Sequence, residues 1–358
     1  MTNKTVKRRA RELGLPFPGT PGPFNAITDV PGVEVGFCTL TDPSQDLRTG
    51  VTAILPRGKS GKAVPVWAGH YALNGNGEMT GTHWIDDAGH FLGPILITNT
   101  HAIGACHTAA VTWMIDTYAD HFRNDHAWAM PVVAETYDGV LNDINRLAVT
   151  PHHALTALAS AAGGPVAEGS TGGGNGMICY EFKGGTGTAS RRVDLGQTWT
   201  VAALVQANFG IRPWLSVLGR PVGLLMPEDR LQEQESGSII VIIATDAPLS
   251  TLALKAVAKR AALGIGRSGT AGGHNSGDIF MAFSTANARP VVAAAEVLRT
   301  ATEIDPNHLD PIYVAAVEAV EEAVINALVA GEDVPTVKPR GATCKAIDCD
   351  RLAAIFTV

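Results

Sequence analysis

The sequence predicts a single α/β domain in which helices cover β-sheets. Of the 358 residues, 46% are apolar, 39 are glycine and only 17% are charged, which is typical of a folded, glycine-rich α/β protein. Short apolar runs alternate along the chain with segments of helical periodicity. No internal repeat and no long linker divides this alternation. We therefore expect residues 1–358 to form one domain.

The first part of the chain predicts an arm followed by strands and one helix. Five prolines within residues 1–36 favour an extended arm that lies over the surface. Strands are expected at residues 51–55, 64–68, 95–98 and 130–134. Apolar residues at three- and four-residue spacing predict a helix over residues 103–118.

The second part continues the same alternation. Strands are expected at residues 200–205, 239–243 and 279–283, and helices at residues 252–263 and 311–328. Ser250 is a suitable N-cap for the first of these helices, and Gly331 ends the second. The polar segment at residues 228–236 is expected to be an exposed loop that tolerates a chain break.

Charge and composition exclude several classes of protein. A net charge of −7 leaves no basic face for nucleic acid or an anionic membrane. The basic N-terminus has no apolar run behind it, and no apolar stretch is long enough to span a bilayer. The five cysteines are scattered and odd in number, so we expect reduced, packed thiols. These features predict a cytoplasmic protein.

The familiar cofactor and metal motifs are missing. The glycine loop at residues 172–176 lacks the spacing and the lysine of a nucleotide-binding loop, and favours close backbone approach or amides that face a substrate. The eleven histidines form no ligand pattern. We expect no metal, no cofactor and no histidine base, so a serine nucleophile would need another base.

The segment QEQESGSIIVIIATDAP, residues 232–248, raises that question directly. Gly237 and Ser238 stand where a polar loop meets a buried strand. Taken alone, they are a turn at the start of a strand. The alternative is a site where the chain cuts itself and exposes a catalytic amine.

Several separated segments resemble the self-processing L-aminopeptidase/D-esterase/amidase family, which includes the β-peptidyl aminopeptidases. They occur in family order along nearly the whole chain: LNGNGEMTG, GPILITNTH, PVVAETYDGVLND, GGGNGMICYEFKGGTGTASR, VQANFG, GSIIVIIATDAP and NSGDIFMAFSTAN. The resemblance implies an αββα sandwich similar to N-terminal-nucleophile hydrolases. It also implies a cut that gives chains 1–237 and 238–358, with Gly237 the last residue of one and Ser238 the first of the other.

The resemblance assigns roles to five more residues. Tyr137 and Asn208 match the transition-state residues, Ser276 and Asp278 match the pair that supports the nucleophile, and Glu135 aligns with the acid that holds the substrate's amino group. Taken singly, each has an ordinary structural interpretation as a strand, turn or surface residue.

The family implies an aminopeptidase for small peptides, amides or esters with a free amino group, assembled as a tetramer or larger. An amidase for β- or ω-amino-acid oligomers and an unprocessed, inactive binding homologue are the alternatives. Two departures stand out: Phe37 replaces a usual His, and Asn175 replaces a common Thr, which leaves any hydroxyl role in the glycine loop in doubt.

Overall fold

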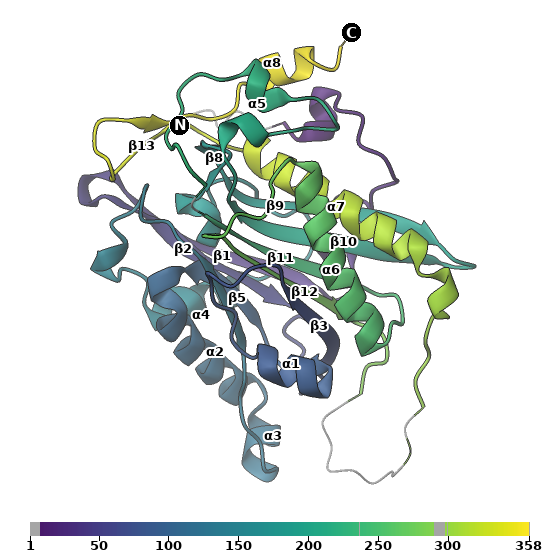
Figure 1. The fold of residues 1–358 in the computed structure, drawn as a ribbon. Helices are drawn as coiled ribbons and strands as arrows, with labels where there is room; N and C mark the ends of the chain where they lie inside the picture. Colours follow the sequence, from purple (N-terminus) through teal and green to yellow (C-terminus); the bar gives the residue numbers. More distant parts are fainter. Residues whose placement is uncertain (1–7, 236, 290–297, 299, 358) are drawn as a thin grey trace.

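Two β-sheets lie face to face, each covered by helices on its outer side, in a computed structural model that describes residues 8–235, 237–289, 298 and 300–357 (Figure 1). One sheet has the strand order β1-β2-β5-β6 and the other β4-β3-β12-β11-β10-β9. The expected αββα sandwich is confirmed.

The four-stranded sheet consists of β1 (Glu34–Asp42), β2 (Leu47–Leu55), β5 (Ile95–Asn99) and β6 (Val132–Thr136). The six-stranded sheet consists of β3 (Val66–Ala72), β4 (His90–Phe91), β9 (Gly185–Asp194), β10 (Thr198–Asn208), β11 (Ser238–Thr245) and β12 (Gly277–Ser284). The short pairs are β7 (Ile178–Cys179) with β8 (Phe182–Lys183), and β13 (Val334–Pro335) with β14 (Thr343–Cys344).

The long apolar run of β11 is explained by the sandwich. Successive side chains of a strand point to opposite faces of its sheet. Ile240 and Ile242 pack between the two sheets, whereas Val241 and Ile243 pack against the outer helices. Both faces of β11 are therefore apolar, and every residue of the strand is buried.

The outer layers are pairs of helices. The four-stranded sheet is covered by α2 (Ile103–Thr117) and α4 (Pro151–Ser160), and the six-stranded sheet by α6 (Thr251–Arg267) and α7 (Asp310–Val329) (Figure 1). The smaller helices are α1 (Thr82–Ala88), α3 (Ala119–Asn124), α5 (Val222–Leu225) and α8 (Cys349–Ala354). As predicted, the Ser250 side chain caps α6, accepting a hydrogen bond from Ala253 N at 3.3 Å.

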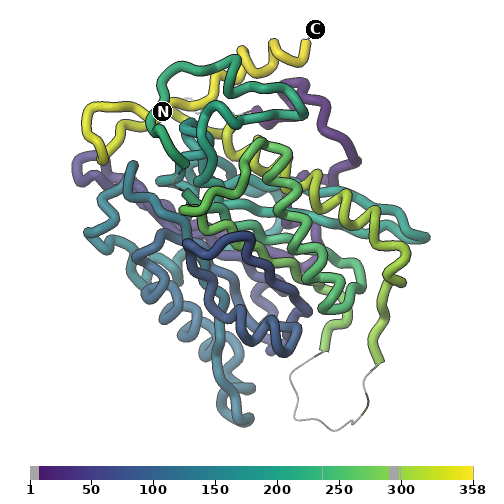
Figure 2. Tube along the Cα trace, viewed as in Figure 1, coloured from purple at the N-terminus to yellow at the C-terminus, as the bar shows by residue number. Residues whose placement is uncertain are grey.

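The N-terminal arm is extended over the part that is described. It contains two 3₁₀ turns, Ala10–Leu13 and Ile27–Asp29, and the first of them contacts both α7 and α8, at the purple end of the trace in Figure 2. Arg11 holds it there through the buried carboxylate of Glu322, at 2.9 Å. The predicted arm is thus confirmed for residues 8–33; residues 34–36 begin β1, and residues 1–7 lie outside the described part.

The loop before β11 is partly different from the prediction. Most of residues 228–235 are exposed, as expected, and Ser236 lies outside the described residues. Glu235, however, is only 9% exposed, because its carboxylate accepts hydrogen bonds from Gly210 N and Thr270 Oγ1. The polar sequence of the loop concealed this long-range contact.

The remaining expectations concern membranes and thiols. None of the helices in the described part of the chain is long and apolar enough to cross a bilayer. No disulfide joins the cysteines of the described part; three of the five are buried, and Cys38 and Cys349 are half-buried. The expectation of reduced, packed thiols is confirmed.

Candidate active site

Three strand ends meet at Ser238. Ser238 is the first residue of β11, and it lies opposite Asn208, the last residue of the antiparallel neighbour β10. On its other side it lies opposite Gly277, the first residue of the parallel neighbour β12. The serine is only 5% exposed. The rigid sheet therefore fixes the position of its side chain.

The hydroxyl of Ser238 has two close partners. Its Oγ donates to the carbonyl oxygen of Gly237 at 2.8 Å and accepts from Gly277 N at 3.1 Å. Gly277 has no room for a side chain, because a Cβ there would lie 2.4 Å from the carbonyl oxygen of Asn76. The hydroxyl is thus oriented toward the peptide bond that precedes it.

Ser276 and Asp278 flank that glycine and form a pair. Ser276 Oγ donates to Asp278 Oδ1 at 2.5 Å, and Asn74 Nδ2 donates to Asp278 Oδ2 at 3.0 Å. Burial raises the pKa of Asp278; the hydrogen bonds from Ser276 and Asn74 partly offset this rise, and the nearby Glu235 carboxylate adds to it. The site therefore contains a fully buried carboxyl directly behind the start of β11.

Asn208 and Tyr137 join the two sheets at the site. Asn208 Nδ2 donates to the carbonyl oxygen of Tyr137 at 2.9 Å, and Ile178 N donates to Asn208 Oδ1 at 2.8 Å. The Tyr137 side chain follows β6, is 44% exposed, and lies against Gly139, where a Cβ would be 2.2 Å from the hydroxyl oxygen. Asn208 is held rigidly, whereas the Tyr137 ring is accessible.

Glu135 is buried at the end of β6, not a surface charge. Its Oε1 accepts from Glu78 N at 3.0 Å, and its Oε2 accepts from the hydroxyl of Thr100. Burial raises the pKa of the Glu135 carboxyl, and these two hydrogen bonds partly offset the rise. A cationic group at this position would gain a strong charge-assisted hydrogen bond.

These residues line one cavity of about 530 Å³, a size suited to a small-molecule ligand. Its wall includes Ser238, Gly237, Asn208, Tyr137 and Glu135. Ser276 and Asp278 lie behind this wall. The seven residues singled out from the sequence are therefore brought together, although they come from both sheets and are up to 143 positions apart in the chain (278 − 135 = 143).

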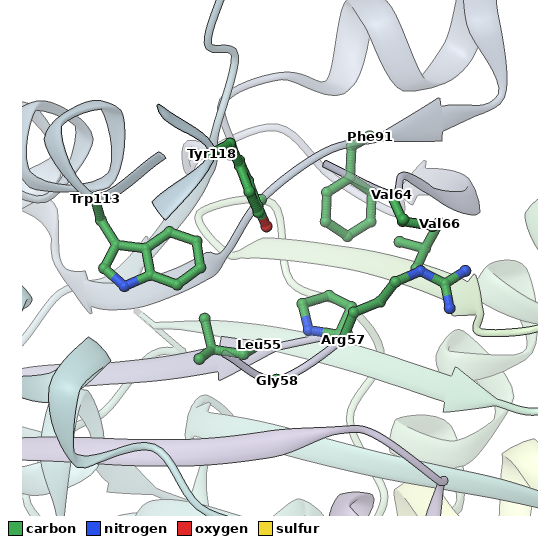
Figure 3. Close-up of a pocket in the computed structure, with 10 residues that line it drawn as sticks. Leu55, Arg57, Gly58, Val64, Val66, Phe91, Trp113 and Tyr118 are labelled. Atoms are coloured by element: carbon green, nitrogen blue, oxygen red, sulfur yellow. The ribbon is translucent and has the colours of Figure 1, made fainter. Parts of the chain in front are cut away.

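A second cavity is too small for a ligand. It lies beside Arg57, with Tyr118 between Trp113 and Phe91, and has a volume of about 10 Å³ (Figure 3). That is about the space that one water molecule needs.

The glycine loop serves close backbone approach. It forms a buried 3₁₀ turn, Gly172–Gly176, whose Gly173 N donates to Thr52 Oγ1 at 3.1 Å. A Cβ on Gly173 would lie 2.2 Å from Gln206 Oε1. Asn175 is fully buried, and its amide donates to Leu40 O at 2.8 Å. The departure at position 175 thus secures the loop to β1.

Several neighbours of the site were not predicted from the sequence. Asn74, Gly277 and Thr100 each hydrogen-bond to a predicted residue, and the Glu235 carboxylate acts on Asp278 electrostatically, but no motif marks the four as a group. Asn74, Thr100 and Gly277 lie inside the quoted family segments, which was their only signal, whereas Glu235 lies outside those segments. Within the described residues, no group of three or more histidine, cysteine, aspartate or glutamate side chains is placed to hold a metal ion.

The fold and the comparisons with known proteins place this chain in one class of protein, the serine-type peptidases and amidases of the Ntn hydrolase fold. The L-aminopeptidase D-Ala-esterase/amidase of Ochrobactrum anthropi, described as a prototype of the serine aminopeptidases and a variant of that fold, superposes with a TM-score of 0.93. It is 54% identical, over 97% of this chain and 98% of that one. A β-aminopeptidase from Burkholderia sp. superposes with a TM-score of 0.90 at 46% identity, with the same coverage.

The sequence comparisons then give the family. Residues 25–341 match peptidase family S58. The β-peptidyl aminopeptidase BapA of Sphingosinicella microcystinivorans is 50% identical over 97% of this chain and 91% of the relative. The chain belongs to peptidase family S58, and the resemblance found in its sequence is confirmed.

Proposed function

We propose that the protein is a self-processing aminopeptidase that releases N-terminal amino acids from small peptides, amides or esters. The acyl group is carried by Ser238, and the base is the α-amine of the same residue. One observation carries the proposal: the Ser238 hydroxyl lies at the meeting of three strand ends, 2.8 Å from the carbonyl oxygen of Gly237, in the large cavity.

Processing begins with the precursor's own serine. Ser238 Oγ attacks the carbonyl carbon of Gly237, and its proton passes to the leaving nitrogen as the C–N bond breaks. The product is an ester between Gly237 and Ser238 Oγ, with a free α-amine on Ser238. Water then hydrolyses the ester, giving the carboxylate of chain 1–237 and the free hydroxyl of chain 238–358.

The new α-amine supplies the base that a serine nucleophile needs. An α-amine has an ordinary pKa of about 8, against about 10.4 for lysine, so a useful fraction is neutral near physiological pH. It takes the proton of Ser238 Oγ during attack on the substrate and returns a proton to the leaving group. Ser276 hydrogen-bonds to this amine, and Asp278 orients Ser276 through the 2.5 Å contact.

The tetrahedral intermediates of both reactions carry an oxyanion. The Asn208 amide is the proposed donor to this oxygen, and its two hydrogen bonds hold it without a change in conformation. Tyr137 supplies a second donor from its accessible hydroxyl. Preorganised donors of this kind stabilise the transition state more than the ground state.

Glu135 explains the requirement for a free amino group. Its carboxylate reaches the same cavity as Ser238, so it pairs with the ammonium of the substrate and sets the distance to the scissile carbonyl. Release of β- or ω-amino acids from amide oligomers is the second candidate. It is favoured by the 50% identity to the β-peptidyl aminopeptidase.

Intact mass of the purified protein tests the proposal. We expect two species that meet at the bond between Gly237 and Ser238, and Ser238→Ala is expected to stay whole and inactive. A wild-type chain that remains full-length after long incubation would instead fit the unprocessed binding homologue. A panel of L-, D- and β-aminoacyl p-nitroanilides separates the two candidate functions, and rapid hydrolysis of N-blocked substrates would contradict both.

We also propose that the enzyme is cytoplasmic and acts as an assembly of several copies. A groove between α6 and α7 supports self-association, because its lining includes the exposed side chains of Leu263 and Val314. Light scattering after gel filtration measures the mass of the particle, and a monomer at micromolar concentration would contradict the assembly.

A further inference from the structure

Glu235 is buried two residues before the proposed cut, in a loop whose neighbouring Glu233 and Gln234 are exposed. Its Oε1 accepts hydrogen bonds from Gly210 N at 3.0 Å and from Thr270 Oγ1 at 3.2 Å. The carboxylate thus connects the loop to the body of the protein just upstream of Gly237.

The contact ties both sides of the scissile bond to one strand end. Downstream, Ser238 is paired with Asn208, the last residue of β10. Upstream, Glu235 is bonded to the amide of Gly210, two residues beyond Asn208. Gly237 lies between them against Asn208, since a Cβ on Gly237 would be 2.1 Å from the Asn208 carbonyl oxygen.

Stability alone does not account for this buried carboxylate. Its Oε2 is inaccessible and has no hydrogen-bond partner among the described residues. Its charge also acts on the buried Asp278, whose pKa it helps to raise. Burying an incompletely bonded carboxylate disfavours folding. A buried charged group that lowers stability in this way is typical of a functional site.

Gly273 provides the space for this group. A Cβ on Gly273 would lie 2.1 Å from Glu235 Oε2, and the nearest atoms are all in the Glu235 side chain. A methyl group there would therefore displace the flexible end of that side chain and would not collide with the backbone.

We propose that Glu235 is a positioning residue for self-cleavage: by holding the acyl side of the scissile peptide on the end of β10, it keeps the Gly237 carbonyl carbon within reach of Ser238 Oγ. The inference rests on the proposed self-processing function. Glu235 takes no proton and touches no reacting atom. After the cut, a substrate supplies the acyl group, so the positioning by Glu235 serves maturation and not turnover.

The test follows precursor decay by intact mass, and turnover per processed site after active-site titration. A displacement of about 1 Å at a reacting group lowers a rate on the order of 10²-fold, so Glu235→Ala should slow processing by about that factor. Glu235→Gln keeps an oxygen acceptor for Gly210 N and should restore processing to within about tenfold of the wild type. Turnover per processed site should fall far less than processing in both, since Glu235 acts on turnover only through its charge on Asp278.

Two matched pairs separate positioning from stability. Gly273→Ala should slow processing as Glu235→Ala does, with an unchanged melting temperature, whereas Gly75→Ala, which meets nothing within 4 Å, should be neutral. Glu233→Ala changes an exposed acid of the same loop and should process at the wild-type rate.

Each outcome decides the inference. Wild-type processing rates in both Glu235→Ala and Gly273→Ala would overturn the role of Glu235 while leaving self-cleavage intact. Equal losses in processing and in turnover per processed site would also overturn it, because the residue would then serve the mature enzyme. If the proposed self-cleavage itself is wrong, the wild-type chain will stay whole, which distinguishes that failure from the two outcomes above.

Discussion

Replacing Gly237 by alanine tests the proposed geometry of the cut. The new Cβ would lie 2.1 Å from the carbonyl oxygen of Asn208 and 3.0 Å from Phe209 Cα. Real Cβ contacts are rarely shorter than 3.0–3.4 Å, so the chain at residue 237 has to move away by roughly 1 Å. The obstructing atoms belong to the backbone of a central strand and its end, so Gly237 has to move and not its neighbours.

A shift of that size at the attacked carbonyl lowers the processing rate on the order of 10²-fold. The assay is the first-order loss of full-length chain by intact mass, with Gly163→Ala as the matched control because a Cβ there meets nothing within 4 Å. Turnover per processed site should change little, since residue 237 is then only the end of the larger chain. Processing of Gly237→Ala at the wild-type rate would refute the reasoning.

Three further predictions concern a pH dependence, substrate binding and stability. Burial raises the pKa of Asp138 from an ordinary 3.8 to about 6, so the protonated carboxyl stabilises the fold fully below about pH 4, and this stabilisation is lost as the pH rises to about 6. Asp138→Asn should therefore gain about 3 kcal/mol in free energy of unfolding relative to the wild type over that interval, and parallel curves of stability against pH would contradict this. Glu135→Gln should raise KM at least tenfold for free-amine substrates and leave N-blocked ones unchanged, and in the wild type that KM should rise as the pH falls through the raised pKa of Glu135. Ser250→Ala removes the cap on α6 and should lower the free energy of unfolding by about 1 kcal/mol in denaturant titration, so an unchanged midpoint would count against the cap.

Prediction from the sequence succeeded where the signal is local. The helix expected over residues 103–118 is α2, Ile103–Thr117, and the strand expected at residues 95–98 is β5, Ile95–Asn99. Apolar periodicity identifies such elements because burial on one or both faces repeats with the geometry of the backbone. The expected strand at residues 64–68 is shifted to Val66–Ala72, since its second half pairs with β12 through residues that are not apolar enough to mark it.

Elements with a weaker local pattern were not predicted. The helix α4, Pro151–Ser160, has two adjacent histidines directly after its first residue, which weaken the apolar pattern there. The strand β1, Glu34–Asp42, is partly exposed and mixes polar with apolar residues, so its pairing with β2 decides its conformation. In both cases tertiary packing outweighs local preference.

The site divides in the same way. By itself the sequence determined that a polar loop meets a buried strand at Ser238 and that strands alternate with helices, and its resemblance indicated which residues match the family's machinery. Only the tertiary structure decided that Ser238 lies between Asn208 and Gly277, and that Glu235 is buried upstream of the proposed cut. Period-two patterning specifies which faces of a strand are covered, but the choice of neighbouring strand depends on contacts between residues far apart in the chain, which no local pattern encodes.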